Sequence, residues 1–179
     1  LVRPDGSKEE IGCQALILAC NGYGGNPAMV ADHIPEMVRA EYFGHPGNQG
    51  DAVNWGEALG AAAKHMTAYQ GHGSVATPHG ILITWAVMMN GGIQVNKLGQ
   101  RFSNEHRGYS EQAVDVLAQP DQVAWAILDD RLLTLGHEFE EFNLAEAAGA
   151  VRHAKDVEDL SKIIDVPMAA LQKTLAETT

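Results

Sequence analysis

The stretch GGIQVNKLGQRFSNE, residues 91–105, gathers the polar side chains most able to do chemistry. Arg101, Asn104 and Glu105 stand just after a predicted hairpin turn, with Phe102 between them. A functional role is one interpretation. In the other, Arg101 pairs with Glu105 and Asn104 satisfies backbone groups of the loop. The spacing alone does not choose between the two.

Two glycine-rich turns could approach a cofactor through their backbone amides. Gly22-Tyr23-Gly24-Gly25 follows a predicted strand and precedes a predicted helix, a place where amides can face a phosphate or a flavin. It is not a GxGxxG motif, and taken alone it favours a tight strand-to-helix turn over a ligand role. At the second turn Asp51 either caps a helix or accepts from a cofactor hydroxyl, while the amides before it, including that of Gly50, face a diphosphate.

Three histidines recur every seven residues, at His65, His72 and His79. The spacing invites a metal site, but glycines and a proline between them prevent a helix that would align them. No carboxylate or thiol clusters with them, so we expect no metal. His72, within Gly71–Gly73, is better placed to donate to a bound anion or carbonyl.

The sequence before residue 66 predicts a strand, a glycine-rich turn and a helix, in that order. The apolar run Ile11–Cys20 predicts a buried strand, although a lone strand has nothing in this chain to pair with. Asn26 is a good N-cap for a helix that begins at Pro27 and ends before Pro35. A longer helix is predicted over residues 51–66.

The composition changes after about Met66, which we take as a domain boundary. Beyond it, residues 81–89, 91–96 and 123–128 look like strands, with a hairpin turn at Asn96–Gly99. Ser110–Ala118 predicts an amphipathic helix, and further helices are expected after Asp156 and Pro167.

Composition and charge exclude several classes of partner. The 179 residues are 45% hydrophobic and carry a formal charge of −11, which argues against nucleic acid and anionic membranes. No apolar run is long enough to span a membrane. Cys13 and Cys20 have no CxxC spacing, so we expect reduced thiols and a cytoplasmic protein. The chain opens on Leu1, which suggests an internal piece.

Three segments together carry a family resemblance. ALILACNGYGGNPAMV, GNQGDAVNWGEALGA and GGIQVNKLGQRFSNE resemble, in order and separation, segments of flavoproteins of the fumarate reductase and succinate dehydrogenase type. That family includes the 3-ketosteroid dehydrogenases. The C-terminal VEDLSKIIDVPMAALQKTL resembles the helix pair that ends the family's mobile capping domain.

The resemblance implies FAD as cofactor and an α+β fold class. Residues 1–66 would be the incomplete C-terminal part of an α/β FAD-binding domain, and residues 67–179 the capping, substrate domain. The nucleotide-binding unit would lie upstream and the rest of the flavin site downstream. We therefore expect the isolated chain to be colourless and inactive.

Site residues follow from the same resemblance. Asp51 matches an FAD-contacting aspartate, and with Gly22 and Gly50 it forms our cofactor-binding set. His72 matches a histidine that binds a substrate carboxylate, and Thr84 matches a substrate-contacting threonine.

Three positions depart from the reductase pattern. The family's proton-relay glutamate and arginine fall on Trp85 and Met88, and its general-acid arginine falls on Tyr109. The reductase proton path is therefore absent. A tyrosine at this place resembles the 3-ketosteroid dehydrogenases, where it accepts a proton. A phenol is a poor base at neutral pH unless a nearby donor or cation stabilises its anion, and Arg101 or Arg107 could do so.

These observations predict an FAD-dependent oxidoreductase that moves hydride and proton across a C–C bond next to a carbonyl or carboxylate. The catalytic set would be Tyr109, His72 and Thr84, acting on a small-molecule substrate. The alternative is a non-catalytic flavin-binding or electron-transfer module that retains the fold. The sequence identifies no electron acceptor.

Overall fold

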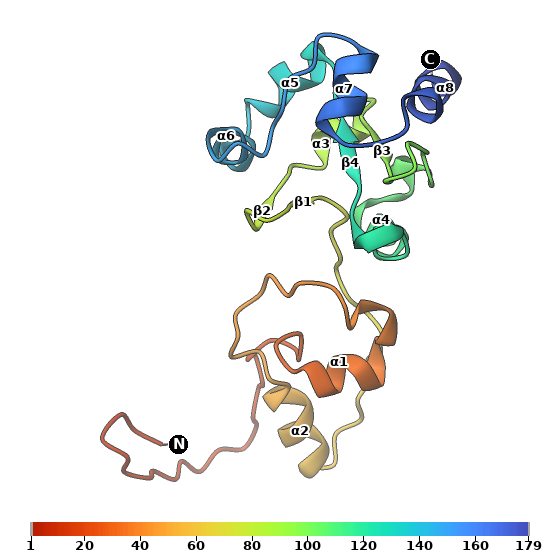
Figure 1. The fold of residues 1–179 in the computed structure, drawn as a ribbon. Helices are drawn as coiled ribbons and strands as arrows, with labels where there is room; N and C mark the ends of the chain where they lie inside the picture. The colour runs from red at the N-terminus through yellow and green to blue at the C-terminus, as the bar shows by residue number, and fades with distance from the viewer. Residues whose placement is uncertain (1, 179) are drawn as a thin grey trace. The chain divides into compact units, whose positions relative to one another are not determined.

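A computed structural model describes residues 2–178, which form two compact units divided after Ala68 (Figure 1). No helix of the described residues is long and apolar enough to cross a membrane. The exposed thiols of Cys13 and Cys20 are free.

The first unit contains short helices joined by long irregular segments. Helix α1 spans Pro27–His33, a 3-10 turn η1 spans Pro35–Met37, and helix α2 spans Asp51–Ala58. The Asn26 side chain accepts from the Met29 N–H, which confirms the predicted cap of α1. Helix α2 is half as long as predicted, because it ends at Ala58 with Leu59 as its C-cap, just before Gly60, whose φ is +88°.

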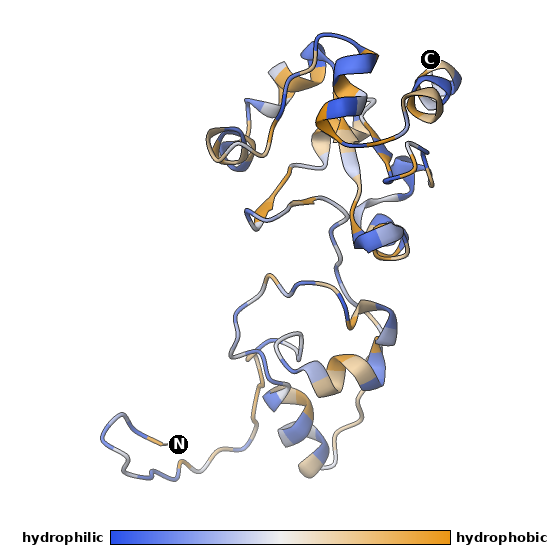
Figure 2. Ribbon diagram, in the orientation of Figure 1, coloured by the Kyte–Doolittle hydropathy of each residue, from blue (hydrophilic) through white to orange (hydrophobic). Residues whose placement is uncertain are grey.

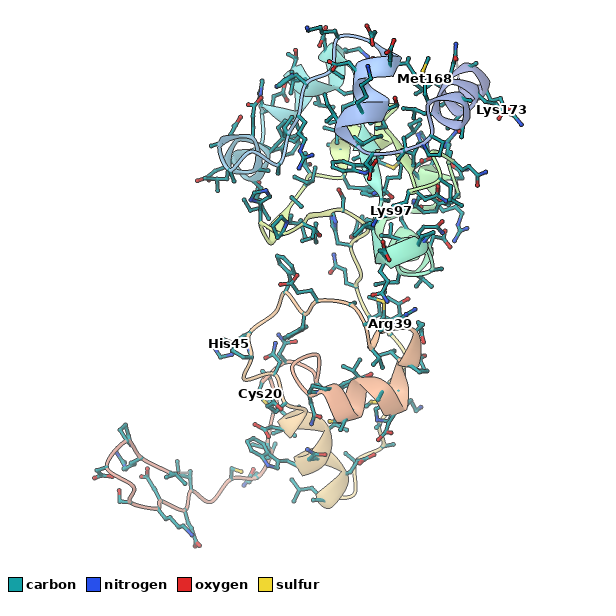
Figure 3. All side chains as sticks on the ribbon, viewed as in Figure 1. Cys20, Arg39, His45, Lys97, Met168 and Lys173 are labelled. Carbon is teal, nitrogen blue, oxygen red and sulfur yellow. The ribbon has the colours of Figure 1, made fainter. Side chains whose placement is uncertain are left out.

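The prediction of a strand at Ile11–Cys20 is wrong. The segment is irregular, and Ile17 and Leu16 are 88% and 59% exposed. Cys20, the last residue of this segment, is labelled in Figure 3. Apolar character alone does not make a strand, because each edge needs a hydrogen-bonding neighbour, and the described residues offer none here.

The second unit contains two small antiparallel sheets. Strand β1, Val75–Ala76, pairs with β2, Ile81–Leu82, and both strands are apolar (Figure 2). Strand β3, Ile93–Val95, pairs with β4, Trp125–Ile127. The turn predicted at Asn96–Gly99 is confirmed, since Asn96 N–H donates to the Gln100 carbonyl at 3.0 Å and Gly99 N–H to that of Asn96 at 2.9 Å.

Helices surround these sheets. Part of the apolar run predicted as a strand is instead helix α3, Ala86–Met89, because short apolar runs suit either state. The amphipathic helix is confirmed as α4. Asp156 caps α7 through its bond to the Asp159 N–H. The remaining elements are η2 Glu105–Arg107, α4 Tyr109–Leu117, η3 Pro120–Gln122, α5 Asp130–Gly136, α6 Glu140–Ala147, α7 Val157–Ile163 and α8 Met168–Thr178.

Among the described residues, all but one of the buried apolar side chains lie in the second unit, and most of these form two clusters. The first cluster joins α3 to α6 and consists of Ile83, Trp85, Val87, Met88, Phe142 and Ala145. The second joins β3 to α7 and α8 and consists of Ile93, Val95, Ile164, Val166 and Leu171. Among the described residues of the first unit, Ile34 alone is a buried apolar side chain.

Candidate functional site

The loop that carries His72 lies between α4 and strand β3, and hydrogen bonds from its backbone N–H groups hold it there. Gly73 N–H donates to the Tyr109 carbonyl at 3.1 Å, and Gly71 N–H donates to the Ser110 hydroxyl at 3.2 Å. A Cβ atom on Gly73 would lie 2.8 Å from Cγ of Gln112 and 3.0 Å from its backbone carbon. A glycine is needed because α4 passes this close.

A buried chain of amide groups fixes the same loop from the other side. Gln94 donates from Nε2 to the Gly73 carbonyl at 2.8 Å, and Gln112 donates to the Gln94 side-chain oxygen at 2.8 Å. Ser103 in turn donates to the Gln112 oxygen at 2.8 Å. Gln94 and Gln112 are 2% and 0% exposed, so these bonds are sheltered from water. We call this set the amide network.

Arg101 and Glu105 have the structural role that the sequence left open. The fully buried Glu105 carboxylate accepts from Arg101 Nε at 3.0 Å and from the Gln94 N–H at 2.7 Å. The pair raises the pKa of Arg101, chiefly through its hydrogen bond to Glu105. Asn104 caps η2 by accepting from the His106 N–H. Both arginines that could have supported Tyr109 pair with carboxylates, Arg101 with Glu105 and Arg107 with Asp115 at 3.3 Å.

His72 and Tyr109 lie together, as the catalytic prediction requires. Their rings stack with centroids 5.5 Å apart, and the edge of Trp85 meets His72 at 5.8 Å. The Tyr109 hydroxyl accepts from Gln70 Nε2 at 3.0 Å. Gln70, which the sequence did not single out, therefore supplies the neutral donor that a phenolate would need.

Burial favours the neutral form of His72. It lowers the pKa of the imidazole below the ordinary value of 6.5. Nδ1 accepts the Ser74 N–H at 3.2 Å, which places the proton of the neutral ring on Nε2. His72 is then a hydrogen-bond donor without charge.

His72 and Thr84 share a pocket of about 270 Å³. Leu82, Trp85, Phe139 and Glu141 complete its lining. Phe139 and Glu141 come from the start of α6, and nothing in the local sequence pointed to them. The structure thus brings His72, Thr84 and Tyr109 into one region of the second unit, with His72 as the shared neighbour.

The predicted cofactor-binding residues meet within the first unit. Gly50 N–H donates to the Gly22 carbonyl at 3.2 Å, and Gly25 N–H donates to the Asn48 carbonyl at 2.9 Å. A Cβ on Gly50, whose φ is +92°, would lie 2.3 Å from the sulfur of Met29. The two glycine turns are therefore packed against each other.

Asp51 is not the cap of α2. Gly50 holds the N-cap position, and Asp51 is the first helical residue, with an exposed side chain. Its carboxylate has no hydrogen bond within the part of the chain that the structure describes. An acceptor beside open backbone amides suits a group that carries hydroxyls and phosphates, so the residues fit one edge of a nucleotide cofactor. No three His, Cys, Asp or Glu side chains of residues 2–178 gather as a metal site would require.

Comparison with known proteins identifies the family. The family model described as "FAD binding domain" matches residues 2–177, so this chain belongs to that family. FAD is the cofactor that this membership indicates.

The matched relatives are considerably longer than this chain. A probable fumarate reductase of Shewanella frigidimarina is 30% identical over 167 residues, which are 93% of this chain and 28% of that protein. An NADH:fumarate oxidoreductase of Klebsiella pneumoniae is 25% identical over 98% of this chain and 19% of its own length. The chain therefore spans about a quarter of the length of these curated relatives.

Two solved structures share the fold. The open conformation of a flavocytochrome c3 fumarate reductase matches with a TM-score of 0.66 and 28% identity, over 88% of this chain and 28% of that one. A 3-ketosteroid-Δ4-(5α)-dehydrogenase from Rhodococcus jostii RHA1 matches with a TM-score of 0.56 and 23% identity, over 88% and 31%. The second likeness concerns the fold alone.

Proposed function

We propose that the protein containing this chain is an FAD-dependent oxidoreductase. It acts on a C–C bond next to a carbonyl or carboxylate, and moves a hydride at one carbon and a proton at its neighbour. The observation that carries this proposal is the His72–Tyr109 ring stack beside a pocket that Thr84 also lines. When bound, FAD supplies the hydride acceptor or donor.

The chain's own residues bind, orient and move the proton. His72 Nε2–H and the Thr84 hydroxyl hold the oxygen of the substrate. Tyr109 takes or gives the proton, and Gln70 stabilises the Tyr109 oxygen by donating a hydrogen bond to it. Asp51 holds part of the cofactor through its carboxylate, and Gly22 and Gly50, whose own amides are bonded within the chain, form the turns beside it. Residues 1–66 are then the end of the FAD-binding domain and residues 67–179 the capping domain.

Anaerobic stopped-flow spectroscopy tests this function directly. A substrate of the stated class should bleach the flavin of the FAD-loaded protein, and the Tyr109→Phe variant should slow the bleaching. Flavin that no carbonyl or carboxylate compound reduces, and that in its reduced form delivers hydride to none, would refute the proposal.

A second candidate is a non-catalytic flavin-binding or electron-transfer module. Trp85 and Met88, at the positions of the reductase relay, are 7% and 0% exposed and belong to the apolar core. They cannot pass protons, so restoring an arginine with Tyr109→Arg alone should not create a fumarate reductase. One-electron reduction without turnover of any alkene or alkane would favour this candidate. The cytoplasmic location inferred from the cysteines stays a prediction.

A further inference from the structure

Asn21 and Gly22, just before the second glycine of the first glycine-rich turn, bring two reactive groups of the chain together. Asn21 is exposed and its backbone is in the left-handed region, with a φ of +65°. The Gly22 N–H donates to Asn21 Oδ1 at 2.9 Å. The Gly22 nitrogen therefore lies beside the side-chain carbonyl group of the residue that precedes it, and Gly22 has no side chain to obstruct their approach.

This arrangement suits an intramolecular cyclisation that needs only hydroxide and water. The Gly22 amide gives its proton to hydroxide, its nitrogen forms a bond to Asn21 Cγ, and the bond from Cγ to Nδ2 breaks and releases ammonia. Water then opens the succinimide ring. Opening at the side-chain carbonyl leaves aspartate, and opening at the backbone carbonyl leaves isoaspartate. Nothing is oxidised or reduced, and holding the two groups together favours the first step.

The sequence has one other Asn–Gly pair, Asn90–Gly91, in which the same groups have different partners. The Asn90 side chain donates from Nδ2 to the Ala86 carbonyl at 2.9 Å. The Gly91 N–H donates to the Met88 carbonyl at 3.2 Å. Both hydrogen bonds must break before the Gly91 nitrogen can attack Asn90, so this pair reacts only through a local opening of the end of α3.

We propose that Asn21 is a site of spontaneous deamidation, at which the folded chain converts its own side chain to isoaspartate and aspartate, while Asn90 is protected. The inference goes beyond the oxidoreductase function and does not depend on it. Isoaspartate adds one atom to the backbone next to Gly22, whose carbonyl accepts from the Gly50 N–H at 3.2 Å. The modification therefore loosens the contact between the two glycine turns.

Peptide mapping of aged protein tests the site. The chain is kept at mildly alkaline pH and body temperature, digested at acid pH, and analysed by mass spectrometry, which detects the mass gained when an amide becomes an acid. Asn21 should react at least about tenfold faster than Asn90, the value of the two neutral hydrogen bonds that must break at Asn90. An isoaspartate methyltransferase should label the Asn21 peptide. Equal rates, or a faster rate at Asn90, overturn the proposal.

Two further measurements separate the folded geometry from the local sequence. In concentrated urea both pairs lose their folded contacts, so the ratio of the two rates should fall close to unity, and a ratio that persists would refute the role of the structure. A Cβ on Gly22 meets nothing within 4 Å, so Gly22→Ala is compatible with the fold, but its methyl group crowds the attacking nitrogen and should slow the loss of Asn21 several-fold. Gly12→Ala, equally unobstructed, is the matched control and should leave the rate unchanged. An unchanged rate in Gly22→Ala would contradict the cyclisation.

Hydrogen exchange at the Gly50 amide tests the effect on the turns. As isoaspartate accumulates, this amide should exchange faster, because the Gly22 carbonyl that accepts from it is displaced. Asn21→Asp carries the new charge on a backbone of normal length and should keep the slow exchange of the unaltered protein. Unchanged exchange in converted protein would refute the effect. Equally fast exchange in Asn21→Asp would refute it too, since charge alone would then explain the change.

Discussion

Tyr109 is the residue on which the proposed chemistry depends most. Tyr109→Phe removes the hydroxyl that accepts from Gln70 and keeps the ring that stacks on His72. Loss of a general acid or base typically costs ~10²–10⁴ in rate, so flavin reduction should slow by at least about a hundredfold. FAD content and the KM for substrate should hardly change. A rate within about threefold of the unaltered protein, far below that range, would make Tyr109 a packing residue.

His72 gives the second prediction at this scale, a dependence of stability on pH. Burial lowers its pKa below 6.5 in the folded protein, so between the two values the unfolded chain binds the proton and the folded chain does not. The stability that neutral His72 contributes is complete above pH 6.5 and is lost as the pH falls toward the folded pKa.

Thermal unfolding midpoints of the unaltered protein and of His72→Gln measure this. When the pH falls from about 7.5 to about 5, the unfolding temperature of the unaltered protein should fall further than that of the variant. The other histidines are common to both proteins, so the difference between the curves belongs to His72. A larger loss in the variant would contradict the sign.

At the scale of elements, the close approach of α4 to the His72 loop makes Gly73 sensitive to substitution by any residue with a Cβ atom. Gly73→Ala places a Cβ 2.8 Å from Gln112 Cγ, and the nearby backbone carbon cannot move aside cheaply. Overpacking of this kind costs ~1–3 kcal/mol. The free energy of unfolding from urea titration should fall by that amount, and the KM should rise as His72 shifts. Gly12→Ala, where a Cβ meets nothing within 4 Å, is the control and should be neutral.

The amide network allows a separate test of the same contact. Gln112→Leu leaves the Gln94 oxygen and the Ser103 hydroxyl without the partners they have now. Each unsatisfied buried group costs ~1–3 kcal/mol, so the free energy of unfolding should fall by at least about 1 kcal/mol. A Gln94→Leu, Gln112→Leu double variant should cost less than the sum of the single ones, and strict additivity would show that the two amides do not interact.

Elements with local signals were predictable, and those that depend on distant partners were not. Asn26 and Asp156 predict the helices that follow them, because an N-cap can be recognised from a few neighbouring residues. The apolar run Ile11–Cys20 has strand chemistry, but the neighbours that would turn it into a strand are not in the described chain. His72 could be proposed from its loop, whereas Phe139 and Glu141 reach the pocket only through the packing of α6 onto β2.

At the scale of the whole molecule, the two units differ in what holds them together. Both buried clusters lie beyond Ala68, and among the described residues before it only Ile34 is a buried apolar side chain. Residues 69–179 expressed alone should therefore unfold cooperatively on heating, while residues 2–68 alone should show no transition, because burial supplies the main stabilising term. Calorimetry of the two pieces decides this, and a sharp transition in the shorter piece would contradict it.

The amide network has an electrical consequence, since Gln94, Gln112 and Ser103 carry no net charge. Salt weakens the interaction between exposed charges, with a screening length of about 10 Å at 0.1 M. It leaves the interactions of buried neutral dipoles almost unchanged. Raising the ionic strength should then loosen surface ion pairs such as Lys162–Glu158 without releasing the His72 loop. Ionic strength therefore becomes a selective probe that acts on the surface ion pairs and leaves the shape of the His72 loop unchanged.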